Sequence, residues 1–126
     1  MVTSLVLAAL TLRAGLRLRS ARRRGVRRSA GAYRRHLRLA KPTLVMLVVG
    51  FAGGPLSAVA LRGFEPFRTA HALVSLVALA SFVTTGVLGW RLEHGRSRAV
   101  DSHAVLGVFS MLAAAAALGT GFVLLP

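Results

Sequence analysis

The chain has 126 residues, and its composition joins a high apolar content to a strongly positive charge. Hydrophobic residues make up 55% of the chain, and 17 Lys and Arg stand against 3 Asp and Glu, which gives a net charge of +14. This combination excludes an ordinary soluble enzyme, because so much apolar side chain could not be buried, and a disordered chain, because disordered segments are poor in apolar residues. The composition therefore indicates an integral membrane protein.

Four apolar stretches predict four membrane helices. The first, residues 2–12, reaches bilayer length only if its helix continues to residue 18, with Arg13 and Arg17 extending to the headgroups. We therefore expect a short first span over residues 1–18, followed by a basic loop and helix start over residues 19–41. Residues 42–61, 69–90 and 104–126 contain no Asp, Glu, Lys or Arg. Each is long enough to cross a hydrocarbon core of about 30 Å. They predict the second, third and fourth spans, the fourth helix running over residues 103–126, and an all-α four-helix integral membrane bundle that forms one domain.

The placement of charge predicts the orientation of this bundle. Between Arg13 and Lys41 lie eleven Arg and one Lys without any acid, and the loop between the third and fourth spans carries three more Arg. Lys and Arg are enriched in cytoplasmic loops. We therefore expect the N-terminus and the loop at residues 62–68 outside and the Arg-rich loop inside. The protein is predicted to be a multi-pass protein of a bacterial inner membrane, either cytoplasmic or photosynthetic.

The Arg-rich segment could in principle neutralise nucleic-acid phosphates. Tyr33 is its only aromatic residue for base stacking, so we expect no nucleic-acid partner. A basic segment tethered between two spans meets anionic lipid headgroups first, at about 1 kcal/mol per basic residue. Anionic lipid is therefore the predicted partner, and an acidic subunit of a larger membrane complex is the alternative.

The remaining composition argues against most catalytic chemistry. The chain has no Cys, which excludes thiolate metal sites and iron–sulfur clusters. Its three acids, Glu65, Glu93 and Asp101, fall in predicted loops, which argues against a proton relay within the membrane and against a glycosidase carboxylate pair. Asp101 or Ser102 fits the N-cap of the last helix. We do not expect the chain to be catalytic by itself.

Three histidines stand near the starts of predicted spans, and each is followed eighteen residues later by a glycine: His36 by Gly54, His71 by Gly89 and His103 by Gly121. Eighteen residues are five turns of 3.6, so each histidine shares a helix face with its glycine. Small residues line these faces, among them Ser75, Ala78, Gly107, Ser110 and Ala114. Plain helix packing uses the same small residues, and a histidine at a membrane boundary costs little, so an interfacial role is the alternative.

Low-spin b-type haem takes two imidazoles from different helices at the same depth. The second and fourth spans run in the same direction, which predicts His36 and His103 as the axial ligands of a haem b iron. His94 is the substitute ligand. His71 lies at the outer side with no histidine opposite, so an outer bis-histidine site cannot be completed from this chain alone. Three cations near the inner pair are predicted to contact the haem propionates: Arg35, Arg38 and Lys41.

Three short motifs within residues 30–126 carry a resemblance to a known family: His36 through Gly54-Pro55-Leu56, then Gly63-Phe64-Glu65-Pro66-Phe67-Arg68-Thr69-Ala70-His71-Ala72-Leu73, and His103-Ala104-Val105-Leu106-Gly107. This part of the chain resembles small cyanobacterial and proteobacterial integral membrane proteins classed as a domain of unknown function. The resemblance implies a four-helix layout similar to transmembrane b-type cytochromes and ferric-reductase-like proteins. It also implies that the three histidines named here are the family-type histidines. The chain departs from those cytochromes, which generally pair four histidines, in its short first span without histidine.

The sequence thus favours a haem-binding electron-transfer protein or cytochrome-like subunit. A second hypothesis is an accessory or assembly subunit of a photosynthetic or respiratory membrane complex, with no cofactor of its own. A third is a subunit that binds a chlorophyll-type pigment, because magnesium needs only one axial histidine and the unpaired His71 would suit it.

Overall fold

The computed structural model describes residues 2–27, 29–63 and 69–123. Four helices make up nearly all of these ranges: α1 (Val2–Arg23), α2 (Ala30–Arg62), α3 (Ala70–Glu93) and α4 (Val100–Val123). No strand occurs in the described ranges, so the predicted all-α class is confirmed. Most of the predicted loop at residues 62–68, including Glu65, and the last residues of the predicted fourth span lie outside them.

The first two helices are longer than the apolar stretches that predict them. α1 continues to Arg23 rather than residue 18, and α2 begins at Ala30, twelve residues before the predicted span. Arg, Leu and Ala are strong helix formers, so the basic segment is helical although its charge suggests a loop. The connection that remains at residues 24–29 turns at Gly25, whose φ of 67° suits glycine. Gly95, with a φ of 68°, ends α3 in the same way.

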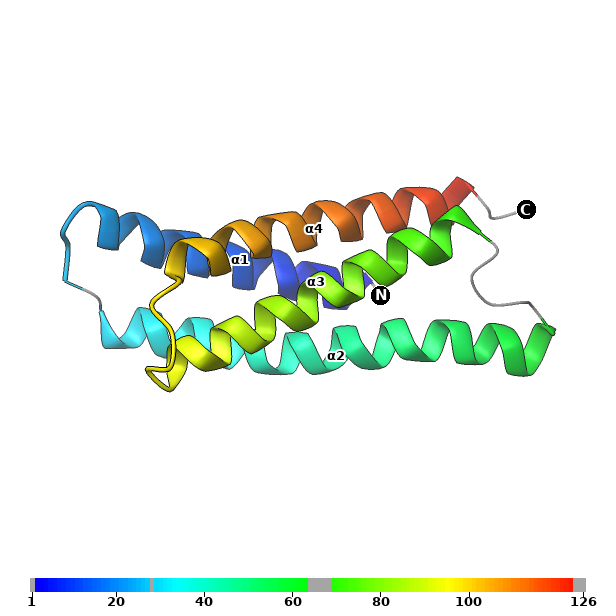
Figure 1. Cartoon of the computed structure of the whole chain (residues 1–126), viewed down its shortest axis with the longest axis horizontal. Helices are drawn as coiled ribbons and strands as arrows, with labels where there is room; N and C mark the ends of the chain where they lie inside the picture. Colours follow the sequence, from blue (N-terminus) through cyan, green and yellow to red (C-terminus); the bar gives the residue numbers. More distant parts are fainter. Residues whose placement is uncertain (1, 28, 64–68, 124–126) are drawn as a thin grey trace.

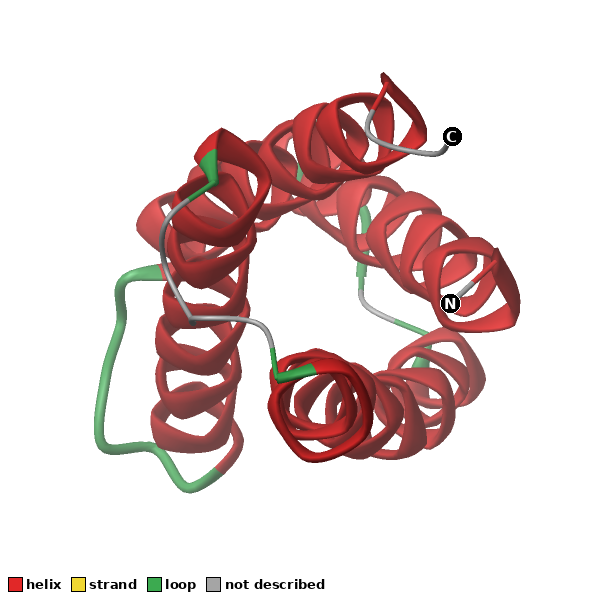
Figure 2. Cartoon of the chain, turned by 90° about the vertical axis from the view of Figure 1, so that its right-hand side faces the viewer, coloured by secondary structure: helices red, strands yellow, loops and turns green. Residues whose placement is uncertain are grey.

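The four helices run antiparallel and surround a common axis (Figures 1 and 2). α1 and α3 each pack against both α2 and α4, so that α1 and α3, like α2 and α4, are diagonal partners without backbone contact in the described ranges. The loops at residues 24–29 and 94–99 lie at one end, which we call the basic end. The end of α2 and the start of α3 lie at the other, which we call the opposite end (Figure 1).

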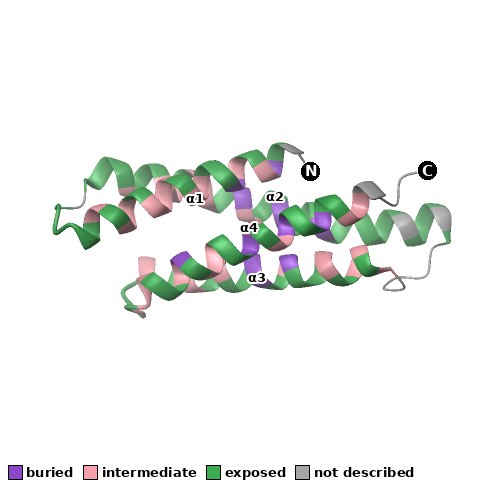
Figure 3. Cartoon of the chain, turned by 90° about the horizontal axis from the view of Figure 1, so that it is seen from above, coloured by how far each residue is buried: buried purple, intermediate pink, exposed green. Residues whose placement is uncertain are grey.

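The buried residues gather near mid-length of the bundle (Figure 3), and many of them are small or hydroxylated, whereas many large apolar side chains on the outer faces are exposed. The core at mid-length consists of Ala8, Leu47, Phe51, Ala78, Phe82 and Ala114. On α3 and α4 the small-residue faces predicted from the sequence do point inward, since each of their members is buried or partly buried. On α2 the predicted face is inward as far as Leu47, whereas Gly50 and Gly54 are exposed.

Three helices are long and apolar enough to cross a membrane: Ala30–Leu61, Ala70–Glu93 and Val100–Gly121, whose apolar 18-residue stretches have mean hydropathies of 2.1, 2.0 and 1.8. Such helices are compatible with a multi-pass membrane protein. α1 has 22 residues but does not join this set, because arginines occupy its second half. The predicted first span is therefore a helix that is apolar over its first half only.

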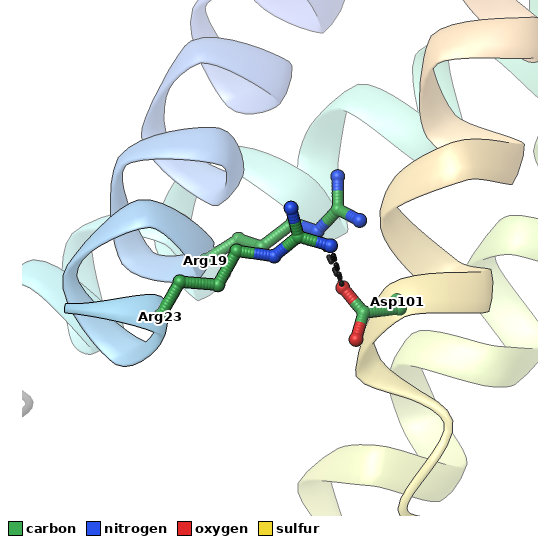
Figure 4. Close-up of polar contacts among 3 residues, drawn as sticks. All are labelled: Arg19, Arg23 and Asp101. Atoms are coloured by element: carbon green, nitrogen blue, oxygen red, sulfur yellow. Dashed lines mark hydrogen bonds and ion pairs between the residues drawn. The ribbon is translucent and has the colours of Figure 1, made fainter. Parts of the chain in front are cut away.

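Ion pairs join neighbouring helices at the basic end. Asp101 accepts a hydrogen bond from Nε of Arg19 at 2.6 Å and lies 3.4 Å from Nη2 of Arg23, which links α4 to α1 (Figure 4). Lys41 and Glu93, 2.8 Å apart, link α2 to α3 in the same manner. The loops connect the other two helix pairs, so the ring is closed at this end. Asp101 therefore does not act as the predicted N-cap: α4 begins one residue earlier, and its carboxylate points to α1.

Candidate functional site

His36 and His103 meet across the bundle near its basic end. Their ring centroids are 6.3 Å apart, and their planes are inclined at 84°. His36 is in the second turn of α2 and His103 in the first turn of α4, and both are partly buried. Because α2 and α4 are diagonal partners, the two side chains bridge helices whose backbones do not touch. The structure therefore brings together the two histidines that the sequence selects as a pair.

Each ring of this pair is held by a neighbouring helix through Nδ1. The Nδ1 of His36 lies 3.2 Å from the carbonyl oxygen of Thr11, and that of His103 lies 3.1 Å from the carbonyl oxygen of Thr85. A carbonyl oxygen can only accept, so Nδ1 carries the hydrogen and donates it. In the neutral ring this leaves a lone pair on Nε2, which is the arrangement of metal-binding histidines.

A glycine makes room for each ring. An ideal Cβ on Gly15 would lie 3.1 Å from Cε1 of His36, and one on Gly89 would lie 3.1 Å from Cε1 of His103. The carbonyl of residue i in a helix points toward residue i+4, so a ring that reaches the carbonyl of Thr11 or Thr85 covers the glycine four residues later. Any side chain there would press on the imidazole.

The two holding residues have a second interaction in common. The hydroxyl of Thr11 is 3.4 Å from that of Thr43, and the hydroxyl of Thr85 is 3.1 Å from that of Ser110. Thr43 and Ser110 each follow the histidine of their helix by seven residues. The hairpin of α1 and α2 therefore repeats the hairpin of α3 and α4, and the two histidines occupy equivalent positions.

His71 is held in the same way at the opposite end. Its Nδ1 donates to the carbonyl oxygen of Ala117 at 2.9 Å, and an ideal Cβ on Gly121 would lie only 2.8 Å from its Cε1. The Thr120 hydroxyl is 3.4 Å from the same nitrogen. The structure does not bring a second histidine to this ring.

The glycines serve a different helix from the one the sequence suggests. The predicted partners share a face of one helix, whereas Gly89 and Gly121 receive histidines from the helix alongside. Apart from the adjoining part of its own helix, no described atom comes within 4 Å of an ideal Cβ on Gly54. Sequence reasoning missed Gly15 and the carbonyl of Thr11. The recurring Thr-x-x-x-Gly at residues 11–15 and 85–89 is the signal that could have found them.

The other candidate residues lie around the pair. His94 is exposed at the end of α3, where its Nδ1 donates to the carbonyl of Trp90 at 2.9 Å and its ring lies 4.7 Å from the Trp90 ring. Lys41 is engaged by Glu93. Arg35 and Arg38 are exposed and, with Gly31, Arg34 and Leu39, line a surface hollow of about 470 Å³ on α2.

A groove of about 400 Å³ lies on α1 beside Met111 of α4. Its lining is mostly apolar and includes Arg13 and Arg17; the other lining residues are Ala9, Leu12, Leu16, Ser20 and Met111. Leu12 directly follows the residue that holds His36, and it would lie 3.6 Å from a Cβ on Gly107, one turn after His103. Neither His36 nor His103 lines this groove.

Within the described ranges no three His, Cys, Asp or Glu side chains gather as they would around a bare metal ion. The candidate site is thus a pair of imidazoles in an all-helical protein with helices fit to span a membrane. In comparisons with family models, curated proteins and solved structures, nothing matches this chain.

Proposed function

We propose that the protein binds haem b between His36 and His103 and transfers electrons within a membrane. The observation that carries this proposal is the pair of opposed imidazoles, each fixed through Nδ1 to a backbone carbonyl of a neighbouring helix. Two imidazoles supply two ligands to a metal ion, and the four nitrogens of a haem macrocycle would supply the remaining four. When bound, haem supplies a one-electron redox couple.

The spacing of the rings supports coordination of one iron. A metal ion midway between the two centroids would lie about 3.1 Å from each. A metal–imidazole bond of about 2.0–2.1 Å, added to the roughly 1.1 Å between a ring nitrogen and the ring centre, gives nearly the same length. The hydrogen bond at Nδ1 fixes the tautomer and the ring orientation, as it does for metal-bound histidines in general.

The surroundings suit the two parts of a haem. The apolar groove between α1 and α4 offers cover for one edge of the macrocycle. Arg13 and Arg17 line this groove and could form ion pairs with the haem propionates. Arg35 and Arg38 remain candidates for the same interaction. Lys41 is the weaker candidate, because Glu93 already binds its ammonium group.

We further propose that the basic end faces the cytoplasm and rests on anionic lipid. Arginines and lysine gather there, and such residues are retained on the cytoplasmic side. This orientation puts the histidine pair near the inner surface, where a soluble or membrane-bound donor could reach the haem edge. It accords with the resemblance to transmembrane cytochromes drawn from the sequence.

Purified protein tests the proposal through its haem content and its reduced-minus-oxidised absorption spectrum. We expect a low-spin b-type spectrum in the wild type and its loss in His36→Ala and in His103→Ala. The matched control is His94→Ala, which removes a histidine at the same end whose ring lies against Trp90 instead. Full-length protein without haem, purified under conditions that retain tight cofactors, would contradict the proposal.

The same sample separates the rival functions. A stoichiometric chlorophyll-type pigment in a solvent extract would favour the pigment-binding subunit. A sample with neither haem nor pigment, whose host complex still assembles when both paired histidines are changed to Ala, would favour the accessory subunit.

A further inference from the structure

Three arginines border one hollow on the outer face of α2, near the basic end. The hollow has a volume of about 470 Å³, and its lining consists of Gly31, Arg34, Arg35, Arg38 and Leu39. Arg38 follows the other two arginines by four and three residues, a spacing that places it beside both on the helix surface. All three arginines are exposed. The hollow is therefore bounded by three positive charges within about 6 Å along the helix axis.

No ion pair joins these arginines to a carboxylate of the described ranges. The acids of these ranges are Glu93 and Asp101, and both already pair with other cations. Glu93 lies 2.8 Å from Lys41, and Asp101 lies 2.6 Å from Arg19. Like charges three and four residues apart repel each other and weaken a helix. An anionic ligand in the hollow would remove this repulsion.

The choice of arginine over lysine in the hollow favours phosphate as the anion. A guanidinium group is planar and can donate two parallel hydrogen bonds to one phosphate, whereas a lysine ammonium acts as a point charge. One phosphodiester carries a single negative charge and would balance one of the three arginines. A headgroup with two phosphates would balance two of them, so it fits the charge of the hollow better.

The face of α2 that carries Arg38 becomes apolar directly beyond it. Steps of four, three, four and seven residues lead along this face to Pro42, Val45, Val49 and Leu56. All four are exposed. A free phosphate would use the arginines alone. A phospholipid would use the whole face, because its charged headgroup and its acyl chains lie end to end in the same order as the two parts of this surface.

We propose that the hollow on α2 binds the headgroup of a phospholipid with two phosphates, such as cardiolipin, whose acyl chains lie along the adjoining apolar face. This inference rests on the proposed orientation, because the arginines must lie at the level of the lipid headgroups. It goes beyond a general attraction to anionic lipid, since it names the binding residues and a preference among anionic lipids. Arg35 and Arg38 then bind phosphate, which leaves Arg13 and Arg17 for the haem propionates.

Native mass spectrometry of the purified full-length protein in detergent micelles measures the affinity for each lipid. At matched total lipid charge, we expect the wild type to bind cardiolipin at least about tenfold more tightly than phosphatidylglycerol, because the second phosphate engages a further arginine. The double variant Arg34→Gln/Arg38→Gln should bind cardiolipin about thirtyfold more weakly, since each basic residue near an anionic headgroup contributes about fivefold. Glutamine favours helix, so this variant should keep α2 intact.

The matched control is the double variant Arg24→Gln/Arg27→Gln. It removes two exposed arginines at the same end of the bundle, and neither of them lines the hollow. We expect it to change cardiolipin binding by about twofold or less, because phosphate contacts in the hollow are retained. Equal losses in the two double variants would overturn the site, since binding would then follow the total charge of the basic end.

Two further outcomes would overturn the assignment of the ligand. Equal affinity for cardiolipin and phosphatidylglycerol at matched charge would contradict the preference for two phosphates. Inorganic pyrophosphate that displaced cardiolipin at equal concentration would show that the hollow binds a soluble diphosphate and that the apolar face is not used. Haem content and the sidedness of the basic end are measured without added lipid, so failure of the lipid site is distinguishable from failure of the proposed function.

Discussion

Thr11 on α1 and Thr85 on α3 occupy equivalent positions in two helical hairpins. Each accepts the Nδ1 hydrogen of a histidine at its carbonyl and brings its hydroxyl against a hydroxyl of that histidine's helix. The two histidines are thereby set at the same level by the same local geometry. His36 and His103 converge because the two hairpins repeat this arrangement. Four features of the bundle can be tested separately.

The first feature is the glycine that leaves room for each histidine ring. Gly89→Ala should lower haem affinity by about tenfold, since the new Cβ would lie 3.1 Å from Cε1 of His103 and displace the ring from its carbonyl. Gly119→Ala is the control, because it makes the same change on α4 where the new Cβ would meet no described atom within 4 Å beyond the adjoining part of its own helix. Haem titration of the apoprotein measures both. Equal affinities in the two variants would show that ring placement does not depend on Gly89.

The second feature is the contact between hydroxyl groups of neighbouring helices. Thr85→Val removes the contact with Ser110 and keeps the backbone carbonyl, so it should lower the free energy of unfolding by about 0.5–1.5 kcal/mol while haem stays bound. Thr84→Val removes a neighbouring exposed hydroxyl that bonds only within α3, to Ala80. It should have a much smaller effect. Denaturation in detergent micelles compares the two, and equal losses would assign no interhelical role to the Thr85 hydroxyl.

The third feature is the ion pair between α2 and α3. A double-mutant cycle with Lys41→Met and Glu93→Gln should give a coupling free energy of about 0.2–1 kcal/mol, because the Lys41 side chain is largely exposed. The coupling should decrease as salt is added, since the charges are screened. A coupling several times larger and insensitive to salt would mean that this pair is shielded from water.

The fourth feature is the orientation of the bundle in the membrane. The sequence contains no Cys, so single cysteines report their own exposure without background. In intact cells a membrane-impermeant thiol reagent should label the Ala70→Cys variant and spare the Arg24→Cys and Arg96→Cys variants. Disruption of the membrane should expose all three. The reverse pattern would place the basic end outside and contradict the orientation inferred from charge.

The number of helices could be predicted from the sequence, because helix length and apolar content are local properties. The shared depth of the paired histidines could also be predicted, because successive spans must run in opposite directions. It located His36 and His103 at one end for that reason. It could not show which helix each glycine serves, since that depends on the order of helices around the ring. Gly89 consequently belongs with His103 instead of with His71, and Gly15 escaped notice. The end of α1 and the start of α2 differ from the prediction because a high density of charge suggests a loop, whereas arginine favours helix.

Electron paramagnetic resonance of the oxidised His71→Ala protein tests the central claim most directly, because that variant isolates the site formed by His36 and His103. Two imidazoles on one ferric iron give a low-spin signal, and planes near the observed 84° make that signal strongly anisotropic. We predict this signal in His71→Ala and its loss when either member of the pair is also changed to Ala. A high-spin signal from the His71→Ala protein, or a low-spin signal that survives His36→Ala, would contradict the account.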